Sequence, residues 1–225
     1  MNTFKVSTHV FFAIACAFAV HSKSFAEPAN LSQLKTEMKA YHESGAYQKE
    51  LSQAIAPATR YIIERAKSNE KRAKPQKLAI VLDIDETSVT NYSHMTARDF
   101  ADNKEDVHRS MLAANAPAIK PMLALYNTAL QKRVAVFFVT GRRESLEKVT
   151  GQNLQFAGFN KWAGLYMRPN HYKHPTIATF KTKTRQAITE KGYTIIASLG
   201  DQQSDLTGGY AEKTYKLPNP YYFIP

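Results

Sequence analysis

Cysteine is almost absent from this sequence, and glycine and proline are scarce. The 225 residues include one cysteine, 9 glycines and 10 prolines, while 44% of the residues are hydrophobic and 22% are charged. This composition excludes a disulfide-rich scaffold, a collagen-like repeat, a disordered chain and a multi-pass membrane protein. The length fits one domain, with room for a small insertion.

Acidic residues are also fewer than basic ones. Lysine and arginine number 30 against 19 aspartates and glutamates, which gives a net charge of +11. The excess is compatible with a solvated lysine-rich surface, with attraction of an anionic substrate, or with nucleic-acid binding. Nucleic acid is the disfavoured partner, because no aromatic-basic repeat and no known binding motif accompanies the charge.

The most apolar run near the amino terminus is too short for a typical membrane-spanning helix. It covers residues 10–20 and follows a short polar start that holds Lys5. A polar stretch then ends in Ser-Phe-Ala at residues 24–26, close to a small-x-small cleavage site. This layout predicts a signal peptide over residues 1–26 and a periplasmic or secreted protein. A lipid anchor on Cys16 is disfavoured, because the apolar run continues past it.

Cleavage after Ala26 would change the inventory of reactive side chains. It would leave 199 of the 225 residues, and the net charge would fall from +11 to +9 because the leader holds two lysines and no acid. The only cysteine would be lost, which excludes thiol catalysis and cysteine-ligated zinc. A chain of this length can rely on its hydrophobic core without disulfides.

The amino-terminal part of the mature chain, residues 27–77, has a helical pattern. Apolar residues recur at three- and four-residue spacing from Leu31, directly after a capping pattern at Asn30 and Gln33. A second helix is expected from Tyr47 to near residue 69. Pro57 is the position at which this helix could kink. The charged residues 67–77 are typical of a loop. We expect this segment to form a helical extension.

The remaining residues, 78–225, alternate between strand and helix patterns. Short apolar runs predict buried parallel strands at 78–82, 134–139, 164–167 and 194–199. Helical patterns lie between them at about 121–132, 143–157 and 182–191. The alternation predicts a Rossmann-like α/β core, with helices on both faces of a parallel sheet. A small helical insertion is expected at about 88–120.

Polar residues gather directly after the predicted strands, where ligands bind in such sheets. They are Asp83 and Asp85, Thr140 and Gly141, Asp201 and Asp205, with Lys181 and Lys183 ahead of the fourth strand. Each alone has a structural explanation, because Asp and Thr cap helices and lysines are usually solvated. Their conjunction and order favour a single site.

The chemistry explains why these residue types belong together. Clustered carboxylates repel one another unless a cation lies between them, and hard oxygen ligands suit Mg²⁺. The Thr140 hydroxyl, the Gly141 amide and a lysine ammonium can bind the oxygens of a phosphate. An aspartate can attack phosphorus, and a second carboxyl two residues on can protonate the leaving alcohol and later deprotonate water.

At these residues the sequence resembles the haloacid dehalogenase-like (HAD) phosphohydrolases, and most closely their subfamily IIIB acid phosphatases. That subfamily includes exported bacterial acid phosphatases and plant acid phosphatases related to vegetative storage proteins. The resemblance rests on Val-Leu-Asp-Ile-Asp-Glu-Thr at 81–87, Phe-Phe-Val-Thr-Gly-Arg at 137–142, Gly-Asp-Gln-Gln-Ser-Asp-Leu at 200–206 and Lys-Leu-Pro-Asn-Pro-Tyr-Tyr at 216–222.

The resemblance implies a role for each residue in hydrolysis of small phosphate monoesters. Asp83 would be the nucleophile and a Mg²⁺ ligand, and Asp85 the general acid and base, with its backbone carbonyl on the metal. Asp201 would be a direct metal ligand. Asp205 would support the site without binding the metal directly. The phosphoryl group would be bound by Thr140, Gly141 and Lys181.

Several alternatives remain open at this point. Lys183 competes with Lys181, which fits the family pattern better, and Arg142 could meet substrate or hold a motif carboxylate. A phosphotransferase could use the same site. A storage or binding protein of the same fold is the other rival. It is disfavoured because such storage proteins have lost the nucleophilic aspartate, whereas Asp83 is kept. His171 and His174 fit an ordinary surface loop better than a metal site.

Overall fold

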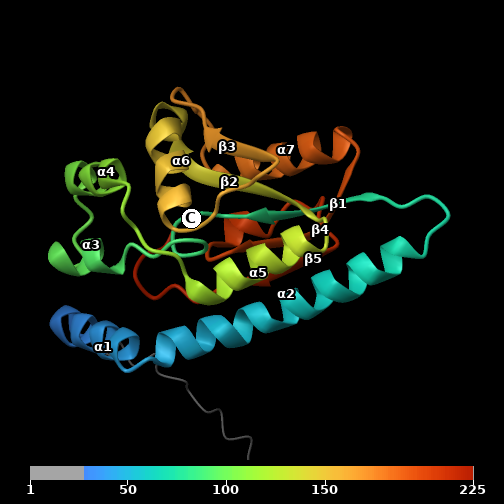
Figure 1. Cartoon of the computed structure of the whole chain (residues 1–225). Coiled ribbons are helices and arrows are strands. Elements are labelled where there is room, and N and C mark those ends of the chain that lie inside the picture. Colours follow the sequence, from blue (N-terminus) through green and yellow to red (C-terminus); the bar gives the residue numbers. More distant parts are fainter. Residues whose placement is uncertain (1–27, 225) are drawn as a thin grey trace, which may run out of the picture.

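The computed structural model describes residues 28–224, so the predicted leader and Cys16 lie outside the described residues. Five parallel strands form one sheet in the order β3-β2-β1-β4-β5 (Figure 1). The strands are β1 (Lys77–Leu82), β2 (Ala135–Arg143), β3 (Gly164–Arg168), β4 (Tyr193–Gly200) and β5 (Lys213–Lys216). The predicted Rossmann-like α/β fold is confirmed.

Helices surround this sheet and connect its strands. They are α1 (Leu31–Glu43), α2 (Ala46–Glu70), α3 (Tyr92–Ala97), α4 (Lys104–Ala113), α5 (Lys120–Gln131), α6 (Glu147–Phe156) and α7 (Ile177–Glu190), with short 3₁₀ turns η1 (Glu144–Leu146) and η2 (Gln203–Asp205). Within residues 28–224, none of the helices combines the length and the apolar character needed to span a bilayer.

The two faces of the sheet bury different clusters of apolar side chains. Ile80 and Leu82 of β1 point to the face covered by α2, α5 and α6, whereas Ala79 and Val81 point to the face covered by α7 (Figure 1). This alternation follows from the two-residue period of a strand. Because β1 is covered on both sides, its sequence is apolar from Leu78 to Leu82, after the exposed Lys77.

Helix α2 continues through Pro57 and is the longest of the described helices. Its buried face includes Leu51, Ile55 and Ile62, which belong to the same cluster as the apolar residues of α5. A proline inside a helix removes one backbone donor, and here the packing of that face against the core compensates for it. The extension is therefore part of the main hydrophobic core.

Helix α7 begins earlier than the sequence pattern predicts. It starts at Ile177, whereas the predicted start is residue 182, because Thr176 after Pro175 takes an extended N-cap conformation. Lys181 consequently lies inside the helix. The helix predicted from residue 143 also begins later, at Glu147, because β2 remains paired with β3 as far as Arg143.

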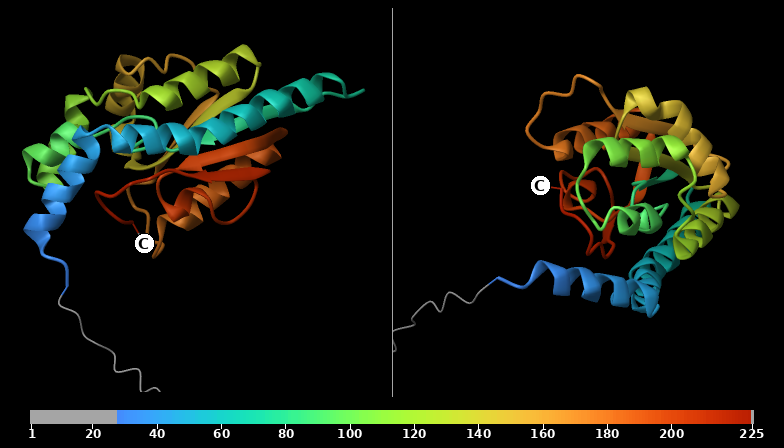
Figure 2. Two further views of the ribbon diagram at one scale, coloured as in Figure 1. Left: turned by 90° about the horizontal axis from the view of Figure 1, so that it is seen from below. Right: turned by 90° about the vertical axis from the view of Figure 1, so that its left-hand side faces the viewer.

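The predicted insertion contains helices α3 and α4, which lie beyond the carboxyl ends of the strands (Figures 1 and 2). Helix α1 lies beside it, and Lys35 of α1 forms an ion pair of 2.7 Å with Asp99 after α3. The imidazole of His42 stacks on the ring of Tyr92 with 3.4 Å between centroids. These segments border the edge of the sheet to which the polar motifs belong.

Candidate active site

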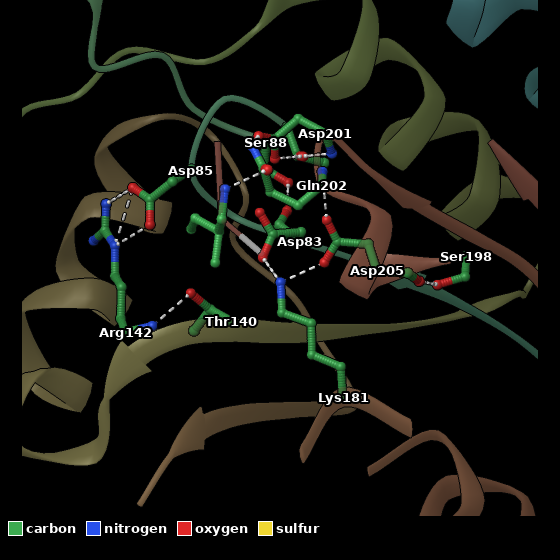
Figure 3. A network of polar contacts seen from close by, with 12 residues as sticks. Asp83, Asp85, Ser88, Thr140, Arg142, Lys181, Ser198, Asp201, Gln202 and Asp205 are labelled. Atoms are coloured by element: carbon green, nitrogen blue, oxygen red, sulfur yellow. Dashed lines mark hydrogen bonds and ion pairs between the residues drawn. The ribbon is translucent and has the colours of Figure 1, made fainter. Parts of the chain in front are cut away.

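Asp83 lies at the carboxyl end of β1, and 6% of its surface is exposed. Its backbone amide donates to Leu199 O at 3.0 Å, which continues the pairing between β1 and β4 by one residue. Its carboxylate accepts a hydrogen bond of 2.9 Å from the ammonium of Lys181, which also contacts Asp205 (Figure 3). The side chain is therefore fixed by the sheet and by α7.

The turn after β4 brings two further carboxylates to Asp83. Oxygens of Asp83, Asp201 and Asp205 lie within 4.8 Å of one another, and all three residues are buried. Gly200 allows this approach, since a Cβ added there would lie 2.2 Å from the side chain of Asp205. Any other residue at position 200 would therefore have to displace the side chain of Asp205.

Burial and mutual repulsion act on the protons of this cluster. Burial raises the pKa of Asp83 well above its usual range, Lys181 opposes that effect, and Asp205 and Asp201 reinforce it. Burial and the charge of Asp205 also raise the pKa of Asp201. For Lys181, burial lowers the pKa, but the carboxylates of Asp83 and Asp205 outweigh it, and the net shift is upward. Lys181 is thus held as an ammonium.

The acidic cluster fits a metal cation. Its three carboxylates face a single neutralising ammonium, so the cluster keeps an excess of negative charge that a cation would relieve. All three groups supply hard oxygen atoms, which suit Mg²⁺ or Ca²⁺ and not a soft metal. The cluster contains Asp205 as well as the two predicted carboxylate ligands, Asp83 and Asp201.

Asp85 points away from this cluster toward Arg142 (Figure 3). The guanidinium of Arg142 contacts it through Nη2 at 2.6 Å and Nε at 3.0 Å, and Asn91 Nδ2 donates to it at 2.9 Å. Burial alone would raise the pKa of Asp85, but Arg142 and Asn91 hold it below its usual range. Of the two open alternatives for Arg142, the structure shows the contact with a motif carboxylate.

Thr140 is buried at the end of β2, and its hydroxyl accepts a hydrogen bond of 3.1 Å from the Arg142 amide. Within residues 28–224 it makes no hydrogen bond to the acidic cluster. Gly141 lies against the start of α7, where a Cβ added to Gly141 would be 3.7 Å from Ile177.

The two candidate lysines differ in burial. Lys183 is exposed, whereas Lys181 is buried, with only 4% of its surface exposed. Of the two lysines, only Lys181 reaches the carboxylates.

Sequence reasoning missed the neutral side chains that hold Asp201. The Thr87 hydroxyl donates to one carboxylate oxygen at 3.0 Å, and Gln202 Nε2 and Asn219 Nδ2 donate to the other at 2.5 and 2.7 Å. Thr87 belongs to the motif at residues 81–87, and this position was a signal that it lies near the site. Asn219 comes from the carboxyl-terminal tail, and nothing in its spacing indicates that the tail returns to β4.

Glu86 was missed as well, although it directly follows Asp85. It is fully buried, has a positive φ of 50°, and accepts a hydrogen bond of 2.5 Å from the Asn91 amide. Burial raises its pKa to about 8, and the charges of Asp85 and Asp201 contribute to the shift. Glu86 thus fixes the turn from which Asn91 reaches Asp85.

A family model described as HAD superfamily, subfamily IIIB (acid phosphatase) matches residues 9–225. The chain belongs to this family. Acid phosphatase 1 of Solanum lycopersicum is 36% identical over 148 residues, which cover 64% of this chain and 58% of that protein. Vegetative storage protein 1 of Arabidopsis thaliana is 34% identical over 111 residues, which cover 49% of this chain and 41% of that protein.

The fold of this subfamily IIIB protein is also found in a solved structure. The class C acid phosphatase of Bacillus anthracis superposes with a TM-score of 0.68 over 86% of each chain, at 19% sequence identity. This likeness confirms the fold. The predicted family, with its plant relatives, is confirmed by the family model and the sequence matches. The chain spans between 41% and 58% of the length of the two plant relatives.

Proposed function

We propose that this protein is an exported, Mg²⁺-dependent acid phosphatase that hydrolyses small phosphate monoesters. One observation carries the proposal: the buried Asp83 carboxylate lies 2.9 Å from Lys181 and within 4.8 Å of the Asp201 and Asp205 carboxylates. A buried nucleophile beside an ammonium is what attack on a phosphate dianion requires. Membership of subfamily IIIB and the similarity to acid phosphatase 1 of tomato support it.

Asp83 is the nucleophile in this proposal. Its carboxylate oxygen forms a bond to phosphorus, and the bond between phosphorus and the ester oxygen breaks. The product is an aspartyl-phosphate at Asp83. Lys181 and, beside it, Thr140 and the Gly141 amide bind the phosphoryl oxygens and stabilise the charge that develops on them.

Asp85 transfers the protons. Its carboxyl group donates a proton to the departing alcohol, and the resulting carboxylate then takes a proton from water as the water oxygen attacks phosphorus. That attack breaks the bond to Asp83 and releases inorganic phosphate. Arg142 keeps the pKa of Asp85 low while the two are paired. Proton uptake by Asp85 before the first step therefore requires an acidic medium or separation from Arg142.

Asp83 and Asp201 would hold Mg²⁺ together with the backbone carbonyl of Asp85. When bound, the ion neutralises the carboxylates and screens an incoming phosphate from them. Asp205 serves the site by fixing Lys181, because its carboxylate contacts the ammonium and also accepts a 2.9 Å hydrogen bond from the Gln202 amide. The site is thus complete without a cysteine or a histidine.

Export rests on the leader pattern of residues 1–26, which lies outside the described residues. We propose a periplasmic or secreted protein. Mass spectrometry of the mature amino terminus, from cells that express the full chain, tests this proposal. A terminus at Glu27 supports it, and an intact leader in the soluble cytoplasmic fraction contradicts it.

A screen of phosphate esters tests the enzymatic proposal. The full chain is assayed with a chromogenic phosphate ester at acidic pH, after EDTA treatment and again after addition of Mg²⁺. We expect release of phosphate that EDTA abolishes and Mg²⁺ restores. The same assay with an added alcohol separates hydrolysis from phosphoryl transfer. Hydrolysis releases inorganic phosphate, whereas transfer forms a new phosphate ester of the alcohol.

The storage-protein relatives make a non-catalytic role the second candidate. That candidate predicts a folded protein without turnover of any ester in the screen. The retained Asp83, its ion pair with Lys181 and the acidic cluster favour the enzyme, because a storage role requires none of these costly buried charges.

A further inference from the structure

Two arginines lie side by side where β2 and β3 end. Arg143 is the last residue of β2, and its partner in the register with β3 is Arg168, the last residue of that strand. The turns that follow are tied together, since Asn170 Oδ1 accepts from the Ser145 amide at 3.2 Å and the Asn170 amide donates to Glu144 at 3.2 Å. The two guanidinium groups therefore come from a braced part of the fold.

Neither arginine has a protein partner for its charge. Across residues 28–224, the guanidinium groups of Arg143 and Arg168 make no hydrogen bond and no ion pair, and Nε of Arg168 is buried without an acceptor. Burial lowers the pKa of Arg168, and the charge of Arg143 lowers it further. Arg143 is exposed and Arg168 is half-buried, so only Nε of Arg168 lacks both water and a protein acceptor. Buried arginine donors are normally paired, and an oxyanion between the two neighbouring guanidinium groups would supply the missing acceptor.

The pair lies on the same edge of the sheet as the candidate active site. Parallel strands bring their carboxyl ends to one edge, and β2 separates β3 from β1. Two strand spacings place Arg168 about 10 Å across the sheet from Asp83. Thr140, a proposed phosphate ligand, precedes Arg143 by three residues on β2. A small molecule could therefore reach both places at once.

We propose that Arg143 and Arg168 bind a second anionic group of the substrate, and that the preferred substrates are phosphate monoesters with a further phosphate or carboxylate group. Guanidinium groups bind such oxyanions through paired hydrogen bonds, and an oxyanion between two arginines relieves their repulsion. The inference rests on the proposed function, because it assumes that the reacting phosphate binds at Asp83 and Lys181.

Unreactive phosphonates test the inference by binding alone. Calorimetry in Mg²⁺ buffer compares alkane bisphosphonates of increasing chain length with an alkyl monophosphonate. We expect one chain length to bind more tightly than the monophosphonate. Arg168→Ala should weaken that bisphosphonate about tenfold, as expected for a lost charge-assisted pair, without the same loss for the monophosphonate. Arg143→Ala should act in the same direction, and Arg168→Lys should retain part of the affinity.

Arg72→Ala is the matched control, because Arg72 is an exposed arginine in the loop between α2 and β1, at the opposite edge of the sheet. It should weaken neither ligand. Equal losses for both ligands in Arg168→Ala, or bisphosphonates that never bind more tightly than the monophosphonate, would overturn this inference alone. No binding of the monophosphonate to the unmodified protein would overturn the proposed function and this inference with it.

Discussion

Burial and catalysis favour opposite protonation states of Asp83. Its burial favours the neutral acid, whereas nucleophilic attack needs the carboxylate, and Lys181 is the nearest group that favours the charged form. Asp83→Asn keeps the shape of the side chain and removes its nucleophilic oxygen. We expect kcat for a chromogenic ester to fall on the order of 10³-fold or more. The thermal midpoint should be maintained, because the change removes one of several repelling carboxylates.

Asp99→Asn is the matched control for Asp83→Asn, since it makes the same chemical change at an exposed ion pair with Lys35. It should retain the kcat of the unmodified protein, because an exposed pair of this kind contributes little. Near-normal turnover by a folded Asp83→Asn protein would remove Asp83 from the role of nucleophile.

The two lysines of α7 differ in what surrounds them. Lys181 is buried against Asp83 and Asp205, and Lys183 is exposed. Lys181→Met should lower catalytic efficiency by roughly 10²- to 10³-fold, on the scale of a lost oxyanion donor. It should also lower the unfolding free energy by a few kcal/mol, because buried carboxylates lose their partner. Lys183→Met should change both quantities little.

Steady-state kinetics and urea unfolding of both lysine variants measure these effects. A larger kinetic defect in Lys183→Met would reverse the assignment. Small defects in both would mean that the phosphate is bound by other groups, with the Thr140 hydroxyl and the Gly141 amide the remaining proposed donors.

At the scale of single side chains, the sequence predicts which residues approach one another better than it predicts their directions. Asp83 and Asp201 follow neighbouring parallel strands, so topology alone brings them together. The turn of Asp85 toward Arg142 depends on local backbone conformation, including the positive φ of Glu86. Asn219 reaches Asp201 across 18 residues of chain, and no periodicity records that contact.

At the scale of elements, the strands with apolar runs were predictable, including β3 at one edge of the sheet, whereas β5 at the other edge was not. The apolar runs of β1, β2, β3 and β4 match the four predicted strands within one residue at their starts. Strand β5 has four residues, mostly exposed, and pairs with β4 through its backbone, so its side chains carry no apolar signal. The sequence pattern did not predict the early start of α7, because that start depends on the turn at Pro175 and Thr176.

The turn after β4 distinguishes its two aspartates. Among residues 28–224, only neutral groups donate to the Asp201 carboxylate, whereas an Asp205 oxygen contacts the ammonium of Lys181. Asp83 also contacts this ammonium, so the comparison concerns the two aspartates of the turn alone, and of these Asp201 is the one without an ion pair, which favours it over Asp205 as the metal ligand. Asp201→Asn should therefore raise the Mg²⁺ concentration for half-maximal activity by roughly 10²-fold, and Asp205→Asn by about tenfold.

Metal titration of both variants after EDTA treatment gives these two concentrations. Thermal unfolding without metal provides the control for general damage to the turn, which both substitutions share. An equal Mg²⁺ requirement in the two variants would contradict the assignment of Asp201 as the direct ligand.

At the scale of the whole molecule, distant segments meet over the carboxyl edge of the sheet. His42 of α1 stacks on Tyr92 of α3 and contacts the Tyr221 hydroxyl at 2.6 Å, and Phe100 stacks on Tyr221. The amino-terminal extension, the insertion and the tail are thus joined by one aromatic cluster. The extension therefore supports both the core, through α2, and the border of the site, through α1.

Because several acids are buried, the unfolding free energy of the whole molecule should depend on pH. The pKa of Glu86 rises from 4.5 to about 8 on folding, so between these pH values the folded chain keeps a proton that the unfolded chain has released. The unfolding free energy should then decrease as pH rises through this window, by about 1.4 kcal/mol per pH unit from this group. The raised pKa values of Asp83 and Asp201 act in the same direction. The lowered pKa of Asp85 has the opposite sign, but its effect falls below pH 3.8, outside this window.

Glu86→Gln tests this dependence, because glutamine is neutral and can accept the same hydrogen bond from the Asn91 amide. Urea unfolding in EDTA at a series of pH values compares the variant with the unmodified protein. We expect the two to be nearly equally stable near pH 4.5 and the variant to gain an increasing advantage, of a few kcal/mol, as pH approaches 8. Parallel stability curves for the two proteins would mean that Glu86 does not carry the proton.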